Sequence, residues 1–284
     1  MTLLLVPGDP LLPRRPDPHF AEEAAAATAF AVIDHDALAA GRDAAAAVAR
    51  VSTGNDAVAR VIAGNDAVYR GWMLRSEHYA AMASALQARG VTLRTSAEQY
   101  RQAHELPGWY PVMAGVTPET VWTVGAGTAE FTAACARLGS GPAVLRDYTK
   151  SEKHHWDTAA YIAEVADPDA AWQVASTLRS LRGDDFTGGF VLRRFETFTG
   201  AEARTWWIDG ECRLVTAHPD TPGETPSPDT SAIAGLIPRL GLPFITADLV
   251  QHTDGRWRLV EIGDGQVSDC PSPATGLISL LSRP

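Results

Sequence analysis

The first hundred residues alternate short apolar runs with segments that repeat apolar residues at helical spacing. The apolar runs predict strands, and the segments between them predict helices, at 2–6, 20–29, 30–33, 37–48, 76–89 and 91–94 in chain order. Gly90 directly follows the helix at 76–89 and is predicted to cap its C-terminus. This alternation of strand and helix predicts a small parallel sheet at the start of the chain.

The rest of the chain has more strands than helices. Helices are predicted at 128–138, 169–181, 231–240 and 275–282, and strands at 143–146, 188–198, 203–208, 212–217, 245–251 and 256–262. Proline and glycine are frequent in 106–118, which predicts a loop and a boundary between domains of residues 1–112 and 113–284. A ten-residue duplication in 48–67 is interpreted as a local repeat, because two copies are too few for a solenoid.

Composition narrows the class of partner. The chain has 24 basic and 34 acidic residues, a net charge of -10, which argues against a surface that coats nucleic acid. The apolar run at 3–6 is too short for a membrane span or a signal-peptide core. The three cysteines are far apart and form no metal-binding motif, which favours a reducing compartment. We therefore expect a cytoplasmic protein with neither nucleic-acid nor membrane partners.

Lysine is used at one place only. Lys150 and Lys153 are the only lysines in a chain that uses arginine at every other basic position, and they lie one helical turn apart. An ammonium is a compact charge with rotatable donors, and a guanidinium does not replace it in every role. This clustering predicts a functional role for the two side chains, whereas a solvated helix start is the alternative.

One hairpin near the C-terminal end carries two carboxylates. Asp254-Gly255 lies between two apolar-rich runs and predicts a two-residue turn. Counting outward from that turn places Asp248 opposite Glu261, with their Cβ atoms about 4.5–5.5 Å apart. The same face of the hairpin is predicted to carry Val250, His252, Trp257 and Leu259.

Two carboxylates at this distance repel each other unless a cation lies between them. Mg²⁺ prefers oxygen ligands and completes its shell with water and phosphate oxygens. Asp248 and Glu261 therefore predict a magnesium site. The alternative is an exposed hairpin with solvated acids, and a one-residue bulge would break the predicted pairing.

The order of these features resembles a known superfamily. A strand with Asp, an Asp-Gly turn, a strand with Glu and the sequence Gly-Asp-Gly-Gln-Val-Ser at 263–268 are similar to the metal-binding end of ATP-grasp enzymes. The resemblance is narrowest with the ATP-grasp clade named for two arginines and a lysine. It extends upstream through 146–156, 189–196 and 202–210, and it covers roughly residues 65–270.

The resemblance implies an α+β and α/β architecture: a small N-terminal α/β domain, then an ATP-grasp fold whose two α+β lobes, 113–198 and 199–284, enclose ATP. It implies nucleotide contacts from Arg146, Lys150, Lys153, Arg193, Phe195, Glu196 and Glu202. Arg204 and Lys150 would stabilise the transferred phosphoryl group. Many members have Asn where this chain has Gly263. Asp264 is therefore predicted to join Asp248 and Glu261 as a Mg²⁺ ligand.

The implied activity is that of an ADP-forming carboxylate–amine ligase. ATP would phosphorylate a substrate carboxylate, and an amine would then attack the acylphosphate to form an amide. The carboxylate is either a small molecule or a peptide, and the protein is expected to form a homodimer. Two other functions stay open: a nucleotide-binding regulatory or partner-binding module without ligation, and a kinase that uses the same cleft.

Overall fold

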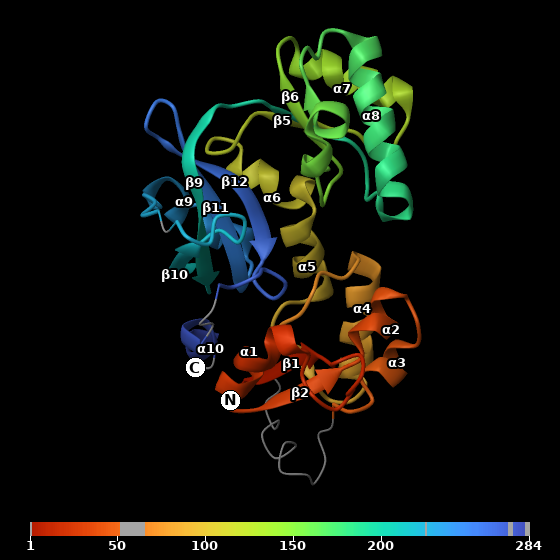
Figure 1. Cartoon of the computed structure of the whole chain (residues 1–284), viewed down its shortest axis with the longest axis vertical. Helices are drawn as coiled ribbons and strands as arrows, with labels where there is room; N and C mark the ends of the chain where they lie inside the picture. The colour runs from red at the N-terminus through yellow and green to blue at the C-terminus, as the bar shows by residue number, and fades with distance from the viewer. Residues whose placement is uncertain (1, 52–65, 225, 272–274, 282–284) are drawn as a thin grey trace.

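Figure 1 shows the computed structural model of the chain, which describes residues 2–51, 66–224, 226–271 and 275–281. Within these residues the strands form three four-stranded sheets. Most of the duplicated segment 48–67 lies outside the described residues. No helix in the described part of the chain is both long enough and apolar enough to cross a bilayer.

The N-terminal sheet is parallel, as predicted. Its strand order is β2-β1-β3-β4, formed by β1 (Leu3–Pro7), β2 (Phe30–Ile33), β3 (Asp66–Tyr69) and β4 (Thr92–Leu93). The helices that connect and cover it are α1 (Ala21–Ala26), α2 (His35–Ala39), α3 (Ala44–Ala47) and α4 (Ser76–Gln87). The single helix predicted at 37–48 is wrong: Gly41 has φ +65°, and Asp43 starts a new helix by accepting hydrogen bonds from two backbone amides.

The second sheet is antiparallel, with strand order β5-β8-β6-β7. It is formed by β5 (Thr120–Trp122), β6 (Ala143–Arg146), β7 (Tyr161–Ile162) and β8 (Val191–Arg194). Helices α7 (Thr128–Leu138) and α8 (Pro168–Arg182) pack on it through a core that includes Phe131, Leu178 and Phe190. A short 3-10 helix (Lys153–His155) and a π-helical turn (Trp156–Ala160) lie between β6 and β7.

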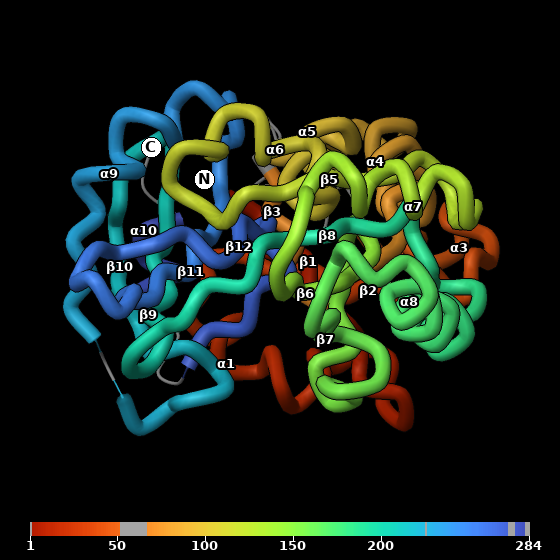
Figure 2. Tube along the Cα trace, turned by 90° about the horizontal axis from the view of Figure 1, so that it is seen from above, coloured from red at the N-terminus to blue at the C-terminus, as the bar shows by residue number. Residues whose placement is uncertain are grey.

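The third sheet is also antiparallel, with strand order β10-β9-β11-β12. Its strands are β9 (Phe198–Ile208), β10 (Glu211–Ala217), β11 (Phe244–His252) and β12 (Trp257–Asp264). The helix predicted at 231–240 is instead a short α9 (Ser231–Ala234) followed by a 3-10 turn (Ile237–Leu240). Figure 2 shows the second and third sheets side by side above the N-terminal sheet, with the chain passing from β8 into β9.

The loop predicted at 106–118 is wrong over its first half. Helix α5 (Ala97–His104) is followed directly by α6 (Leu106–Met113), which contains two prolines. Pro107 lies in the first turn of α6, where a backbone amide has no partner within the helix. Leu106 and Trp109 pack into the core of the third sheet. Because α6 is buried there, proline content alone did not mark a flexible linker.

The C-terminal helix returns to the N-terminal sheet. In α10 (Thr275–Leu281), Leu277 and Ile278 pack with Leu4 and Val6 of β1. Figure 1 shows α10 beside α1, close to both chain ends. Helix α6, from the first half of the chain, therefore packs on the third sheet, and α10, from the second half, packs on the N-terminal sheet. The boundary between 112 and 113 stays a prediction.

Candidate active site

The β11–β12 hairpin brings the two predicted carboxylates opposite each other, but by a different register. Asp248 pairs with Glu261, as predicted. Nearer the turn the pairs are Leu249 with Leu259 and Gln251 with Trp257, one residue out of the predicted register. The register changes because Val260 is an extra residue on β12, a β-bulge.

Because of the bulge, the face of the hairpin that carries Asp248 and Glu261, here called the acidic face, contains other residues than predicted. The turn contains three residues, since the His252 amide donates to the Arg256 carbonyl at 2.8 Å. Leu259 and Trp257 pack in the core of the third sheet, so their predicted place beside the carboxylates is wrong. Arg258 pairs with Val250 in register, and its guanidinium forms two hydrogen bonds, 2.7 and 2.8 Å, with the Glu196 carboxylate.

Asp248 is held by Arg204 of the neighbouring strand β9 and lies near His218, which follows β10. Arg204, its register partner on β9, donates from Nε and Nη2 to the two carboxylate oxygens at 2.9 Å each. The Nε2 atom of His218 lies 3.6 Å from the same carboxylate. Burial alone would raise the pKa of Asp248, but the hydrogen bonds from Arg204 and the proximity of His218 hold it below its ordinary value. The carboxylate is therefore ionised although it is only 4% exposed.

Glu261 is held from the opposite lobe. Arg146, at the end of β6, donates from Nη2 to the Glu261 Oε1 atom at 2.8 Å. Burial opposes ionisation, but the charges of Arg146 and Lys150 lower the pKa of Glu261 overall. The side chain is 41% exposed, so it faces the space between the lobes. The Arg146–Glu261 pair joins the second and third sheets at the place where the predicted magnesium site lies.

A buried aspartate shapes the loop that carries the lysines. The Oδ1 atom of Asp147 accepts hydrogen bonds from the Thr149 and Lys150 amides, each at 2.7 Å. Its Oδ2 atom accepts from Arg182 at 2.9 Å and from the Thr187 amide at 3.2 Å. Sequence reasoning missed Asp147, although an aspartate directly after a strand is typical of such side-chain-to-backbone turns.

The two lysines have different surroundings. Within the described residues, the Lys150 ammonium has no hydrogen bond or ion pair, and the residue is exposed. The Lys153 ammonium bonds to Asp220, on the far side of the cleft after β10. The structure therefore leaves Lys150 available for a ligand, whereas Lys153 already links the two lobes.

Arg193 and Arg194 point to opposite faces of β8, as alternation in a strand requires. Arg193 is buried and donates to the carbonyl of Val260, the bulge residue, and to the Thr117 hydroxyl, both at 2.8 Å. Burial and the charge of Arg146 lower the pKa of Arg193 to about 10. Arg194 bonds to the carbonyls of Leu138 and Ser140 instead. Arg193 thus satisfies the backbone carbonyl that the bulge exposes.

Phe195 and Glu196, two of the predicted nucleotide contacts, follow β8 directly. The Phe195 ring packs edge-on against Trp156 and Tyr161, and its amide donates to the Pro142 carbonyl at 3.0 Å. Glu196 is occupied by its ion pair with Arg258. The structure places these residues along the lobe junction, and their contact with a nucleotide stays a prediction.

Glu202 approaches Asp248 through a histidine that sequence reasoning missed. The Glu202 carboxylate lies 3.7 Å from His218, which also approaches Asp248. Ligand atoms of these three residues lie within 4.8 Å of one another, so they form a candidate cation-binding group. Burial raises the pKa of Glu202, which is partly offset by the histidine. The signal for His218 was weak, since it comes one residue after β10 and belongs to no motif.

Asp264 does not lie with the other two predicted metal ligands. It is three residues beyond Glu261 on the same strand, so it projects to the other face of β12. There its Oδ1 atom accepts from the Gln266 amide at 2.8 Å, and its buried Oδ2 atom has no partner among the described residues. Burial raises its pKa to about 7. Its role as a metal ligand stays a prediction.

The position at which the resemblance expects Asn is filled from neighbouring residues. A Cβ atom on Gly263 would lie 2.9 Å from the Thr246 hydroxyl and 3.2 Å from the Ser268 hydroxyl. These two hydroxyls bond to each other at 2.8 Å. Thr246 pairs with Gly263 and lies two residues before Asp248, so it shares the acidic face. The hydroxyl oxygens of Thr246 and Ser268, rather than the Asp264 carboxylate, therefore lie beside Gly263 at the end of the acidic face.

Three conspicuous side chains have structural positions. Trp206 and Trp207 are buried in the core. Arg70 is also buried, where it forms two hydrogen bonds of 2.6 Å with Glu23 and caps carbonyls of the loop after β12. Through these contacts Arg70 fixes the loop after the third sheet to the N-terminal unit.

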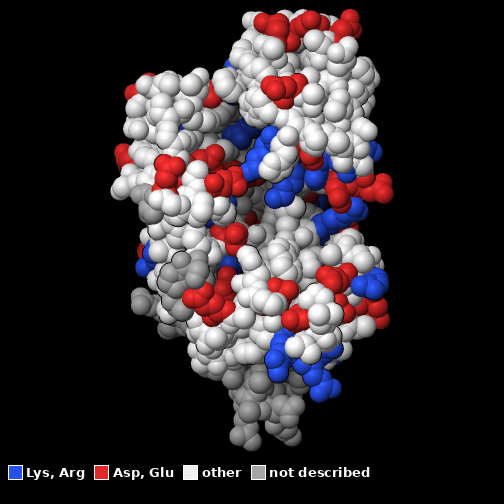
Figure 3. Space-filling view, viewed as in Figure 1, with Lys and Arg blue, Asp and Glu red and all other residues white. Residues whose placement is uncertain are grey.

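The arrangement of charge across the cleft is visible in Figure 3. Lys and Arg gather on the side of the hollow formed by the β5–β8 lobe, and Asp and Glu lie across from them. Asp248 and Glu261 supply hard oxygen donors, and the basic side supplies the charge that phosphate oxygens require. The residues present therefore fit a magnesium–phosphate ligand.

The fold and the site define an ATP-grasp protein. More narrowly, the chain belongs to the third ATP-grasp domain family of the clade named for two arginines and a lysine, whose model matches residues 137–282, more than half of the chain. This confirms the superfamily and the clade expected from the sequence. No curated protein matches the chain in sequence.

Solved structures share the fold along the whole chain. A RimK domain ATP-grasp protein from Sphaerobacter thermophilus DSM 20745 is 17% identical, with a TM-score of 0.62 and coverage of 99% of both chains. D-cycloserine synthetase DcsG is 15% identical, with a TM-score of 0.59 and coverage of 99% of this chain and 100% of that one. ATP-grasp ligase PsnB, complexed with a minimal precursor, Mg and ADP, is 11% identical, with a TM-score of 0.55 and coverage of 98% and 96%.

Proposed function

We propose that this protein is an ATP-dependent, ADP-forming ligase that joins a carboxylate to an amine through an acylphosphate. The observation that carries the proposal is the pair of carboxylates on β11 and β12. Arg204 of β9 bonds to the first, Arg146 of β6 bonds to the second, and these bonds favour the ionised form of each. Membership of an ATP-grasp family and the fold shared with DcsG and PsnB support it.

The proposed roles follow from charge and position. Asp248 and Glu261 would hold Mg²⁺, which neutralises charge on the ATP phosphates when it is bound. Arg146 and Lys150 would bind the β- and γ-phosphates from the opposite lobe. Arg204, already beside Asp248, would stabilise the phosphoryl group as it moves to the substrate carboxylate. Lys153 and Glu202 would close the phosphate side of the cleft, and Arg193, Phe195 and Glu196 its adenine side.

Positioning and fixed charges would supply most of the rate enhancement. Phosphoryl transfer needs little covalent chemistry from the protein, and the ion pairs of Asp248 with Arg204 and of Glu261 with Arg146 hold the charged groups in place before the substrate arrives. The substrate carboxylate attacks the γ-phosphorus, and ADP leaves. The amine then attacks the carbonyl carbon, and phosphate leaves. Cytoplasmic location and a homodimer stay part of the proposal.

The test is an assay for product formation with a reactive nucleophile. The protein is incubated with MgATP, hydroxylamine and, in turn, each standard amino acid and a panel of dipeptides as carboxylates. A ligase is expected to release ADP and to form an acylhydroxamate with at least one carboxylate. Glu261→Gln should abolish both products, because it removes a charged metal ligand and keeps the side-chain shape.

Three other results would reject ligation. Binding of MgATP without ADP release for any carboxylate would favour the regulatory module. ADP release with a stable phosphorylated product and no hydroxamate would favour the kinase. ADP release that does not depend on a carboxylate would indicate simple hydrolysis.

A further inference from the structure

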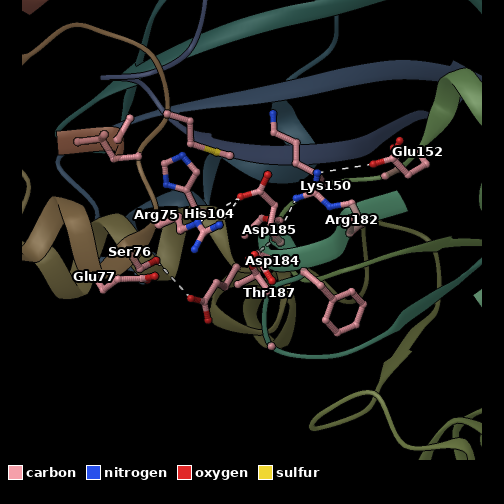
Figure 4. Close-up of a pocket in the computed structure, with 18 of the residues that line it drawn as sticks. Arg75, Ser76, Glu77, His104, Lys150, Glu152, Arg182, Asp184, Asp185 and Thr187 are labelled. Carbon is pink, nitrogen blue, oxygen red and sulfur yellow. Dashed lines mark hydrogen bonds and ion pairs between the residues drawn. The ribbon is translucent and has the colours of Figure 1, made fainter. Parts of the chain in front are cut away.

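A cavity of about 710 Å³ opens beside the candidate active site, between the N-terminal unit and the β5–β8 lobe. Its walls come from the segment after β3, the end of α5, the Lys150 loop and the loop before β8. Figure 4 shows Lys150, His104 and several acidic side chains among the residues that line it. Lys150 belongs both to this cavity and to the charged cleft, so the cavity adjoins the phosphate end of the cleft.

The free charges of the cavity are mostly acidic. Arg75 is paired with Asp185 at 2.6 Å, and Arg182 is paired with Asp147 at 2.9 Å. Glu77, Glu105 and Asp184 line the cavity without an ion pair among the described residues. The cavity therefore favours a cationic or amine ligand over a second anion.

His104 offers a proton acceptor at the cleft end of this cavity. Its Nδ1 atom lies 2.9 Å from the Tyr100 carbonyl, which only accepts, so Nδ1 carries the proton and the lone pair is on Nε2. Within the described residues Nε2 has no hydrogen-bond partner. The ring packs against Tyr100 with a centroid distance of 4.1 Å, which fixes its direction.

Two charged residues of the cleft, Lys150 and Glu261, lie near enough to His104 to affect its protonation. Burial lowers its pKa to about 4, and the charges of Lys150 and Glu261 also act on it. The imidazole is therefore neutral at physiological pH. Phosphate groups bound beside Lys150 would add negative charge and raise its affinity for a proton.

We propose that this cavity binds the amine substrate and that His104 accepts a proton from the amine through Nε2. The inference rests on the proposed ligase function. As the amine nitrogen bonds to the carbonyl carbon, the bond from that carbon to the phosphate oxygen breaks and phosphate leaves with its electron pair. The nitrogen releases its proton to Nε2, which then passes it to phosphate or water. Glu77, Glu105 and Asp184 attract the amine into the cavity.

The test compares two nucleophiles in wild type and His104→Asn. Asparagine can keep the donor to the Tyr100 carbonyl, but it has no basic nitrogen. Once bonded to the carbonyl carbon, the weakly basic hydroxylamine nitrogen gives up its proton readily to water. The more basic methylamine nitrogen holds its proton more tightly and depends on Nε2 to accept it. The carboxylate is one that gives hydroxamate with the wild type. His78→Asn, a half-buried histidine of α4 outside the cavity, is the matched control.

The expected result is a split between the two products. Methylamide formation should fall about 100-fold in His104→Asn, whereas hydroxamate formation stays within about threefold of wild type. An equal loss of both products, or no loss of either, would overturn the role of His104. A wild type that forms no hydroxamate with any carboxylate would instead reject the ligase function itself.

Discussion

The two sides of the cleft carry opposite charge and are built in different ways. On the third sheet, Glu202, Asp248 and Glu261 lie on paired strands, and their spacing is set by strand pairing and by the bulge at Val260. On the β5–β8 lobe, Lys150 lies in a loop that a buried aspartate organises. On the acidic side, arginines already hold the carboxylates of Asp248 and Glu261, whereas the basic side presents the ammonium of Lys150, which has no partner among the described residues. A magnesium–phosphate ligand needs both, so neither side alone forms the site.

The largest expected effect comes from removing charge on the acidic side. Glu261→Gln should lower ADP formation by about 100- to 1,000-fold, because an electrostatic contact to the reacting group is lost. The amide oxygen can still accept from Arg146, so the fold should persist, as circular dichroism would show. The control is Glu119→Gln, an exposed partner of Arg194 outside the cleft, which should keep wild-type activity.

The next largest effect is on the free energy of unfolding, through the Arg204–Asp248 ion pair of the acidic side. Arg204→Met should lower the free energy of unfolding by about 3 kcal/mol, since it leaves the buried Asp248 carboxylate without its main partner. Urea denaturation measures the change. Adding Asp248→Asn should recover part of the loss, and a double variant no more stable than the single one would contradict this explanation.

Acid titration examines the same ion pair. The pKa of Asp248 is lower in the folded state, so its contribution to stability is complete above its unfolded value, about 4, and is lost as pH falls through the folded value. Unfolding measured from neutral to acidic pH should therefore show a loss that Asp248→Asn reduces. An unchanged acid dependence in that variant would argue against the pair.

A third effect separates Asp264 from the metal ligands. Its folded pKa, about 7, is above its unfolded value, so wild-type stability falls as pH rises between the two values. Asp264→Asn should stabilise the protein above pH 7 by on the order of 2 kcal/mol and should keep magnesium-dependent activity. Loss of that activity in a folded variant would restore Asp264 as a ligand.

The smallest effect compares the two lysines of the basic side. Lys150→Met should raise the KM for ATP about tenfold, because this ammonium has no partner among the described residues and is free to bind phosphate. Lys153→Met removes only an exposed bond to Asp220 and should change the KM less than about threefold. Equal effects would mean that the two lysines share one role.

The difference between strand pairing, which follows from a local pattern, and contacts made only in the tertiary structure explains how much the sequence could predict. The parallel sheet and the pairing of Asp248 with Glu261 follow from hydrophobic alternation and strand period. The pairing was right for an incomplete reason: the three-residue turn shifts the register by one residue, and the bulge at Val260 shifts it back before Asp248 and Glu261. A bulge is stabilised by tertiary contacts, here from Arg193, which a local pattern does not contain.

Residues brought together by tertiary structure were harder to predict. His104 and His218 belong to no motif. His104 becomes relevant only when α5 packs against β12, and His218 only when β10 pairs with β9 in the third sheet. The loop at 106–118 was predicted from proline content, but burial of Trp109 stabilises a helix there. Asp264 was chosen because it follows Gly263, where the resemblance expects Asn, although alternation along β12 puts it on the face opposite Glu261.

Thermal unfolding with and without MgATP, in wild type and Glu261→Gln, tests the central claim most directly. At about 100 times the dissociation constant, the ligand should stabilise the wild type by roughly 2.7 kcal/mol, a shift of a few degrees. We expect this shift to need magnesium and to be lost in Glu261→Gln. A variant that keeps the full magnesium-dependent shift, or a wild type that shows none, would contradict a nucleotide site built on Asp248 and Glu261.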